Sequence, residues 1–350
     1  MAKLNVLNTP ISLICLLAAN ANVSASETDF TTYTDARSNG LSRSTVASEF
    51  GISALFNNPA GIQFSPSDNS LKKIIGTSVD YSQLKNEQIT YTDNNENDLS
   101  WHTLAFVSDA ESFSYGIGVT KGMQARTETW QRHSRGAEQK ELSVDQFSFS
   151  AAKRIGDTKL GIAYHILDAQ FGETYSALSA QGYSLGVQHN AINEYTDLFD
   201  TSVNITFDLG ASYHSEVYTN TMPVGYQDDS MTLKPSQSNL GVNLGLSLLT
   251  GKVSSKLNIM AQMTTSTASY VQGRYQEFSA KRLGLEYTVF NALGNTDLQL
   301  RAGRQVYSES SQSPSSSYGI GFKSQRFAFD IAIHNALSDR HVTASISYLF

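Results

Sequence analysis

The chain has 350 residues, with 25 lysines and arginines against 32 aspartates and glutamates, which gives a formal net charge of −7. This acidic balance argues against nucleic-acid binding, because phosphate recognition needs a clustered basic surface. An apolar content of 40% is too high for a disordered chain, and the lack of any run of 18 apolar residues excludes a transmembrane helix in the mature protein. Six prolines against 24 glycines, with 17 tyrosines and 17 phenylalanines, are typical of a strand-rich chain with glycine turns.

Residues 1–25 are expected to be a secretory signal peptide. Lys3 supplies a weak positive start, and residues 11–19 (ISLICLLAA) form a short apolar core. Small residues follow at two places, so cleavage is expected after Ala21 or after Ala25. The only cysteine lies in the apolar core, so the mature chain would contain neither a disulfide nor a thiolate metal site.

From about residue 72 onward, apolar residues alternate with polar or very small ones. Every second residue is Leu or Val in 240–248, and residues 203–213 repeat the pattern. Because side chains alternate faces along a strand, each stretch has one apolar and one polar face. A soluble antiparallel sheet would alternate in the same way. These stretches, however, are longer than most strands of globular sheets and match a tilted bilayer crossing, and their polar faces suit a lumen.

The alternation predicts fourteen strands whose connections are alternately short and long, as in outer-membrane barrels. Segment 182–190 and the long link 191–201 fit least well, and without them the count falls to twelve. A bulge is expected near Asp145 and Gln146, where the alternation breaks. The predicted fold class is an all-β, closed antiparallel transmembrane barrel, because lipid cannot satisfy an open sheet edge. The expected strands are 72–84, 98–108, 112–123, 141–154, 157–168, 182–190, 202–214, 237–249, 254–265, 278–290, 296–306, 316–324, 326–335 and 341–350.

The last strand, 341–350 (HVTASISYLF), carries a second signal. Its alternate residues from Val342 to Phe350 are apolar or aromatic, and Thr and Ser occupy the other face. A final strand that ends in Phe350, with Tyr348 two residues earlier, resembles the signature by which the barrel-assembly machinery recognises bacterial outer-membrane proteins. The alternative is a soluble protein that ends in an aromatic residue.

Residues 26–70 do not alternate, and they precede the barrel predicted over 71–350. A polar lumen gives such a segment somewhere to pack, which suggests a hatch inside the barrel; the alternative is a periplasmic extension. The segment contains Asn58, Pro59 and Ala60. Pro59 fixes its own φ and biases Asn58 toward extended geometry, as a hinge or anchor requires. A simple turn into the first strand would explain the same residues.

Residues 36–62, which end in Asn-Pro-Ala-Gly-Ile, resemble the N-terminal hatch of the FadL/TodX family of outer-membrane transporters. The resemblance implies a fourteen-stranded barrel in the outer membrane of a Gram-negative bacterium, with the Asn58–Ala60 motif in a hatch that controls passage. It also implies uptake of small hydrophobic molecules, either long-chain fatty acids or aromatic hydrocarbons. TraF-like conjugal-transfer barrels and PorV-like secretion barrels share the motif. The chain is shorter than the family, and it has Ser42-Arg43-Ser44 where these relatives usually carry a glycine-rich stretch.

Several charged residues are expected on the luminal face among glycine and serine. Their mixed charge does not by itself indicate a hydrophobic pocket, so the hydrophobic substrate class comes from the resemblance alone. The lumen candidates are Asp80, Asp208, Glu286, Arg301, Asp330 and His334.

Catalytic motifs are weak. Ser184 stands in a G-x-S-x-G sequence, but the alternation continues through it and no helix pattern follows, whereas a nucleophile elbow needs a sharp strand-to-helix turn. Ser150 and Lys153 match S-x-x-K beside a predicted turn. The seven histidines are dispersed at no ligand spacing, so no metal site and no cofactor are expected.

The sequence therefore favours an outer-membrane transporter and not an enzyme. Its expected partners are outer-membrane lipid, the barrel-assembly machinery and a small hydrophobic ligand. The alternative is a non-transporting barrel that acts in envelope assembly, secretion or conjugal transfer. An outer-membrane hydrolase is a minor alternative.

Overall fold

A computed structural model gives the fold of the chain. It describes residues 35–62, 73–85, 96–110, 113–128, 139–171, 175–198, 201–221, 232–233, 236–249, 254–269, 275–307, 314–336 and 339–350. Long strands dominate, and within these residues three short helices precede them: α2 (Ala36–Gly40), η1 (Ser53–Leu55) and η2 (Pro59–Ile62). The strands are β1 (Lys73–Lys85), β2 (Glu96–Ala110), β3 (Phe113–Glu128), β4 (Gln139–Ile155), β5 (Thr158–Phe171), β6 (Tyr175–Leu198), β7 (Thr201–Thr221), β8 (Thr232–Leu233), β9 (Ser236–Leu249), β10 (Ser254–Ser269), β11 (Tyr275–Val289), β12 (Asp297–Tyr307), β13 (Ser315–Lys323), β14 (Phe327–Ala336) and β15 (Asp339–Leu349).

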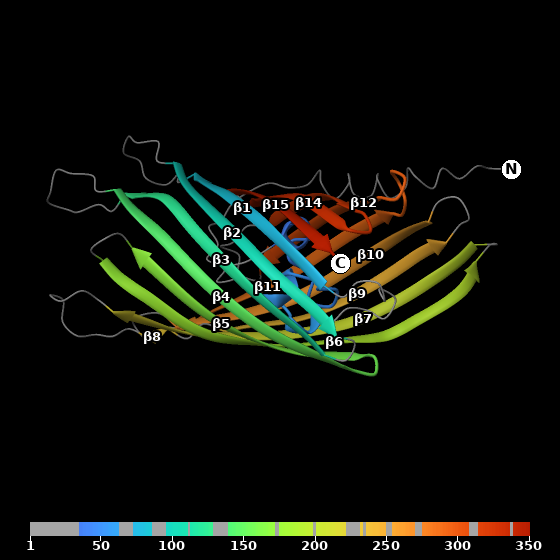
Figure 1. The fold of residues 1–350 in the computed structure, drawn as a ribbon, viewed down its shortest axis with the longest axis horizontal. Helices are drawn as coiled ribbons and strands as arrows, with labels where there is room; N and C mark the ends of the chain where they lie inside the picture. The colour runs from blue at the N-terminus through green and yellow to red at the C-terminus, as the bar shows by residue number, and fades with distance from the viewer. Residues whose placement is uncertain are drawn as a thin grey trace.

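The strands form one antiparallel sheet that closes on itself (Figure 1). β1 pairs with β15, β7 pairs directly with β9, and the β6–β7 pairing completes the ring. β8 is only a two-residue strand beside β7, so the ring itself has fourteen strands. The predicted closed fourteen-strand antiparallel barrel is confirmed, and closure leaves no lateral sheet edge to face lipid.

β6 differs most from its prediction. Residues 191–198, expected to belong to a long link, continue the strand, and β6 pairs with β7 as far as Leu198 opposite Thr201. A shift in register between Asn190 and Ile192 interrupts the alternation there, which is why the pattern hid the rest of the strand. The twelve-strand alternative is therefore wrong.

The bulge expected near Asp145 is also wrong. Residues 142–155 of β4 pair with 158–171 of β5 without any shift in register. The irregularity of the β3–β4 pair lies between Gln124 and Thr127 of β3 instead. Apolar residues on both faces of β4 break the alternation in the sequence, and this break led to the wrong prediction of a bulge.

At one end of the barrel, which we call the short-turn end, every link between strands has two to seven residues. There only residues 111–112, 156–157 and 199–200 separate three of the strand pairs. The longest links, 86–95, 129–138 and 222–235, are at the opposite end, which we call the long-loop end, although the links 172–174 and 337–338 at that end are short.

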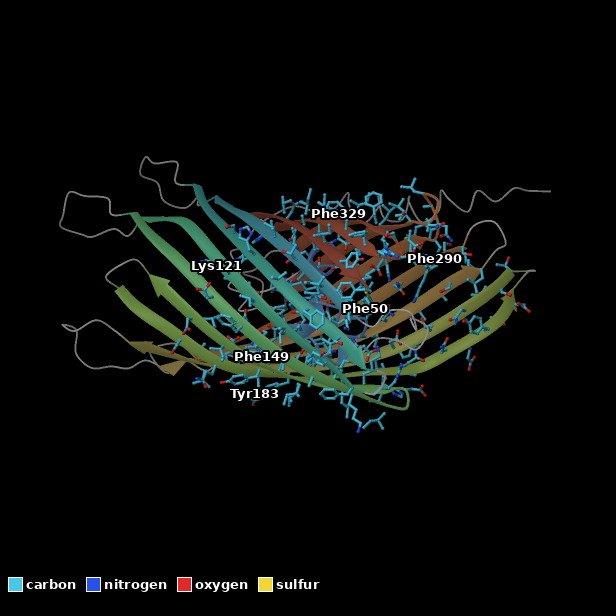
Figure 2. The ribbon with its side chains drawn as sticks, viewed as in Figure 1. Phe50, Lys121, Phe149, Tyr183, Phe290 and Phe329 are labelled. Carbon is cyan, nitrogen blue, oxygen red and sulfur yellow. The ribbon has the colours of Figure 1, made fainter. Side chains whose placement is uncertain are left out.

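The two faces of the barrel wall differ in chemistry. Phe149, Tyr183 and Phe329 are exposed on the outer surface (Figure 2). Polar side chains, among them those of Ser148 and Ser184, are buried on the inner face. An apolar outer face around a polar interior is the pattern of a transmembrane barrel.

Residues 35–62, which we call the lumen segment, lie inside the ring (Figure 1). α2 contacts β12–β15 on one side, and η2 contacts β2–β6 on the other. Most residues of the segment are buried, and the others are partly buried. The segment therefore spans the bore and touches opposite walls.

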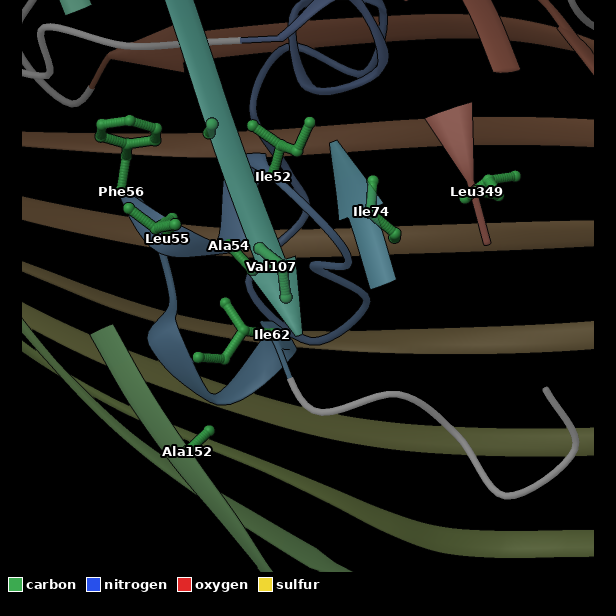
Figure 3. Close-up of a cluster of buried hydrophobic side chains, with 10 residues drawn as sticks. Ile52, Ala54, Leu55, Phe56, Ile62, Ile74, Val107, Ala152 and Leu349 are labelled. Atoms are coloured by element: carbon green, nitrogen blue, oxygen red, sulfur yellow. The ribbon is translucent and has the colours of Figure 1, made fainter. Parts of the chain in front are cut away.

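One flank of the lumen segment is apolar (Figure 3). Ile52, Leu55 and Ile62 pack there against Ile74 of β1 and Val107 of β2. Leu55 and Val107 are completely buried. Burying a side chain of this size contributes about 1.5–3 kcal/mol, so this cluster fixes the segment to the wall of β1, β2, β4 and β15.

Within the described residues, no helix has the length and apolar character needed to cross a membrane. The expected signal peptide, 1–25, lies outside the described residues, as do 26–34 and 63–70 of the expected hatch. The predicted domain boundaries therefore stay predictions.

The outward direction of Ile331, in the middle of β14, gives a test of the strand's register. Ile331→Arg should lower the free energy of unfolding by about 2–4 kcal/mol, because the charge would enter the hydrocarbon near its midplane. Phe327→Arg, on the same face at the short-turn end, should lower it by only about 0–1 kcal/mol. Denaturant titration in lipid vesicles measures both values, and equal costs would contradict the register.

Candidate functional site

Asn58, Pro59 and Ala60 are buried in the bore against the wall of β4–β6. The amide nitrogen Nδ2 of Asn58 donates to the carbonyl oxygen of Val46 at 2.7 Å and to that of Val187 at 3.3 Å. Val46 belongs to the lumen segment and Val187 to β6. Asn58 therefore ties the segment both to itself and to the wall, a geometry that differs from a simple turn into the first strand.

Glycines in the wall make room for the lumen segment. A Cβ atom on Gly161 of β5 would lie 2.2 Å from the carbonyl carbon of Pro59. A Cβ atom on Gly210 of β7 would lie 2.4 Å from the carbonyl oxygen of Val46. Non-bonded contacts of a Cβ atom are essentially never so short, and here both neighbours are backbone atoms. These wall positions therefore require glycine as long as the segment is seated.

Ser42 and Arg43 adopt a backbone conformation that favours glycine. Their φ angles are +49° and +59°, in the left-handed region. Such angles cost a residue with a side chain about 1–2 kcal/mol. The contacts of Ser42 hold it there, because both its backbone N–H and its hydroxyl hydrogen-bond to the hydroxyl of Ser317 on β13, at 2.8 and 2.7 Å. The departure from a glycine-rich sequence at this place thus retains a glycine-like backbone.

Charged residues attach the other flank of the lumen segment. Arg37 of α2 donates to both carboxylate oxygens of Glu286, from Nε at 3.0 Å and from Nη2 at 3.1 Å. Arg301 donates from Nε to Glu286 Oε2 at 2.7 Å and from Nη1 to Asp330. Glu286 and Arg301 are almost fully buried. Burial opposes the charge of Arg37, but the Glu286 carboxylate outweighs it and raises the pKa of the guanidinium.

The structure thus brings together three of the six lumen candidates, Glu286, Arg301 and Asp330. Asp208 lies apart on β7, where it accepts from Asn190 Nδ2 at 2.7 Å and from Asn243 Nδ2 at 3.0 Å. His334 lies on β14 with its ring 6.0 Å from that of His341, centre to centre.

The side chain of the remaining candidate, Asp80, lies outside the described residues. At the end of β15, the rings of Tyr348 and Phe350 lie 5.0 Å apart, centre to centre. Their expected role in barrel assembly stays a prediction.

Two charged residues of the lumen segment escaped the sequence analysis. The sequence gives no sign that Arg37 forms an ion pair, because its partner Glu286 is 249 positions away. Glu49 is buried and accepts hydrogen bonds from the hydroxyls of Thr45 and Ser53. Burial, together with the nearby charge of Asp35, raises the pKa of Glu49 to about 7, against the opposing effects of both hydroxyls and of Arg37.

Ser184, the serine of the G-x-S-x-G sequence, belongs to a chain of hydrogen bonds that the sequence did not predict. Its Oγ lies 2.9 Å from Nε2 of His165 and 2.6 Å from Nδ1 of His214. Nε2 of His214 lies 2.9 Å from Oε1 of Glu216. Since a carboxylate only accepts, His214 donates from Nε2 to Glu216.

The hydrogen bonds connect Ser184, His214 and Glu216 in the order nucleophile, base and acid, but the geometry does not support acyl transfer. Ser184 is fully buried in a straight strand. Around it, β6 pairs with β5 on one side and with β7 on the other, so the backbone N–H groups there are used in the sheet and cannot form an oxyanion hole. The second motif is split, because Ser150 is buried on the inner face and Lys153 is exposed.

In the part of the chain that the structure describes, no group of three or more His, Cys, Asp or Glu side chains is placed to hold a metal ion.

Solved structures share this fold. A TodX monoaromatic hydrocarbon channel with the deltaS2S3 mutation is 13% identical, with a TM-score of 0.52, over 90% of this chain and 98% of that chain. The deltaS2 mutant of the same channel is 11% identical, with a TM-score of 0.50, over 91% and 99%. The toluene transporter TodX of Pseudomonas putida is 14% identical, with a TM-score of 0.49, over 89% and 97%. No protein-family profile and no curated protein sequence matches the chain. The resemblance to the FadL/TodX barrels expected from residues 36–62 is thus confirmed at the level of the fold.

Because the pKa of Glu49 is raised, we expect the seating of the lumen segment to depend on pH. The seated state binds a proton up to about pH 7, whereas a solvated glutamate releases it near pH 4.5, so seating weakens as the pH rises through this window. Conductance in planar bilayers should therefore be several-fold higher at pH 8 than at pH 5. Glu49→Gln, neutral at every pH, should remove most of this difference.

The matched control is Glu194→Gln, a change of the same kind at an exposed residue of β6. It should leave the pH dependence as in the unchanged protein. If Glu49→Gln kept the full pH dependence, another group would have to cause it.

Proposed function

We propose that the chain is an outer-membrane transporter for small hydrophobic molecules, in which the lumen segment controls passage. The observation that carries the proposal is the filled bore: an apolar-faced closed barrel whose interior is occupied by a segment of its own chain. A barrel that only anchored the chain in lipid would need no such segment. The likeness of fold to monoaromatic hydrocarbon channels supports the same function.

We further propose that the barrel resides in the outer membrane of a Gram-negative bacterium. The barrel-assembly machinery would insert it there through the β15 end, with Tyr348 and Phe350 as its signature. Outer-membrane lipid would cover the apolar outer face. Either aromatic hydrocarbons or long-chain fatty acids would be the ligands, and Asn58, Pro59 and Ala60 would anchor the segment as it moves.

The deciding experiment is ligand uptake by vesicles that contain the purified protein. Toluene and a long-chain fatty acid should enter faster than into empty vesicles, and deletion of residues 26–62 should change the rate several-fold. If neither ligand entered or bound, and envelope proteins co-purified with the chain, a role in assembly, secretion or conjugal transfer would replace transport.

The ion pairs of α2 give a finer test of control by the lumen segment. Arg37→Ala should increase conductance several-fold, because it removes two hydrogen bonds to Glu286 and leaves that buried carboxylate with less compensation. Single-channel recording in planar bilayers measures the change.

Arg326→Ala is the matched control, because Arg326 is exposed in the turn before β14. It should leave the conductance as it was. An Arg37→Ala protein with unchanged conductance would show that this flank of the segment does not limit passage.

A further inference from the structure

A cavity of about 510 Å³ lies at the short-turn end, between the lumen segment and the inner wall formed by strands β4 to β7, β9 and β10. Phe50 of the lumen segment and Phe290, which follows β11, lie on its lining (Figure 2). Tyr195 of β6 adds a third aromatic ring. The volume is within the range of small-molecule sites, and the three rings offer it apolar surface.

One wall of this cavity carries oxygen atoms without partners. Oδ1 of Asn204 and Oγ1 of Thr206, both on β7, are buried and have no hydrogen-bond partner among the described residues. The same holds for Oδ1 of Asn243 on β9 and of Asn258 on β10, two residues that stand beside this wall and do not line the cavity. Asn204 itself is only 8% exposed. Leaving such a group unpaired costs about 1–3 kcal/mol, so the clustering of four on three adjacent strands calls for an explanation.

Gly245 of β9 lies at the centre of this cluster. It pairs with Thr206 on one side and with Asn258 on the other. A Cβ atom on Gly245 would lie 2.3 Å from Oγ1 of Thr206, 3.0 Å from Oδ1 of Asn258 and 3.1 Å from Cε of Lys256. Oγ1 of Thr206, Oδ1 of Asn258 and the end of the Lys256 side chain thus pack closely together over Gly245. Lys256 and Thr206 also line the cavity, so this group of atoms adjoins it.

The hydrogen-bonding groups at this wall favour a ligand group that both donates and accepts hydrogen bonds. The amide oxygens only accept hydrogen bonds, whereas the Lys256 ammonium only donates them. A hydroxyl group can satisfy both, because it donates and accepts. A metal ion would be repelled by Lys256, and a hydrocarbon would leave the oxygens unpaired.

We propose that this cavity binds a hydroxylated aromatic molecule, with the ring against Phe50 and Phe290 and the hydroxyl at Thr206 and Lys256. Thr206 reaches the ligand by a turn about its Cα–Cβ bond, which exchanges one staggered rotamer for another. The inference rests on the proposed function and narrows its ligand class. Among aromatic ligands, those with a hydroxyl group bind in this cavity more tightly than those without one.

The experiment is equilibrium dialysis of the full-length protein in detergent micelles against radiolabelled catechol and toluene, with empty micelles subtracted. The unchanged protein should bind catechol more tightly than toluene. Thr206→Val removes the hydroxyl at nearly constant volume, and it should weaken catechol binding about tenfold while toluene binding stays the same or tightens. Thr206→Ser, which keeps the hydroxyl, should bind catechol as before.

Thr120→Val is the matched control, because Thr120 is a buried inner-face threonine of β3 that does not line the cavity. It should change neither affinity. Folding is checked by the heat-dependent gel shift of barrels, and Thr206→Ala replaces Thr206→Val if the latter does not fold. The inference is overturned if catechol does not bind, or if Thr206→Val weakens both ligands equally.

The two proposals fail separately. If vesicles take up toluene and catechol does not bind the cavity, transport stands and the hydroxylated ligand is rejected. If catechol binds with the expected dependence on Thr206 and no vesicle takes up any aromatic compound, the cavity stands and transport is rejected.

Discussion

Closure of the hydrogen-bonded ring is the constraint on which the rest of the structure depends. In lipid, an unpaired backbone group has no water to bind, so every strand needs two neighbours. The β1–β15 and β6–β7 pairings meet this need and fix a bore of fourteen strands. A bore of this size cannot be filled by wall side chains that are mostly small and polar. The lumen segment fills it, and its buried charges then require partners on the wall.

The fold was largely predictable because alternation is a local property. The alternation in residues 240–248 predicts β9 without information from any other strand, and all fourteen strands were predicted in this way. The errors fell where local order breaks. The shift between Asn190 and Ile192 hid the second half of β6, and apolar residues on both faces of β4 imitated a bulge that the pairing with β5 does not contain.

The candidate site was predictable only in part, because its contacts are not local. The alternation placed Glu286, Arg301 and Asp330 on the inner face, and their opposite charges made ion pairs between them possible. Arg37, which completes the group, lies in an irregular segment whose path no periodicity describes. The same limit applies to Gly161 and Gly210, whose need for glycine appears only once the backbone of residues 46–59 is placed against them.

The lumen segment is held by two unlike flanks, an apolar one on β1, β2, β4 and β15 and a charged one on β11, β12 and β14. Water can hydrate charges as they separate, but it gains nothing from contact with Ile52, Leu55 and Ile62. If solvent entered the bore, the charged flank would therefore separate before the apolar one. The apolar flank would then act as a pivot, and the lumen segment would stay inside the barrel.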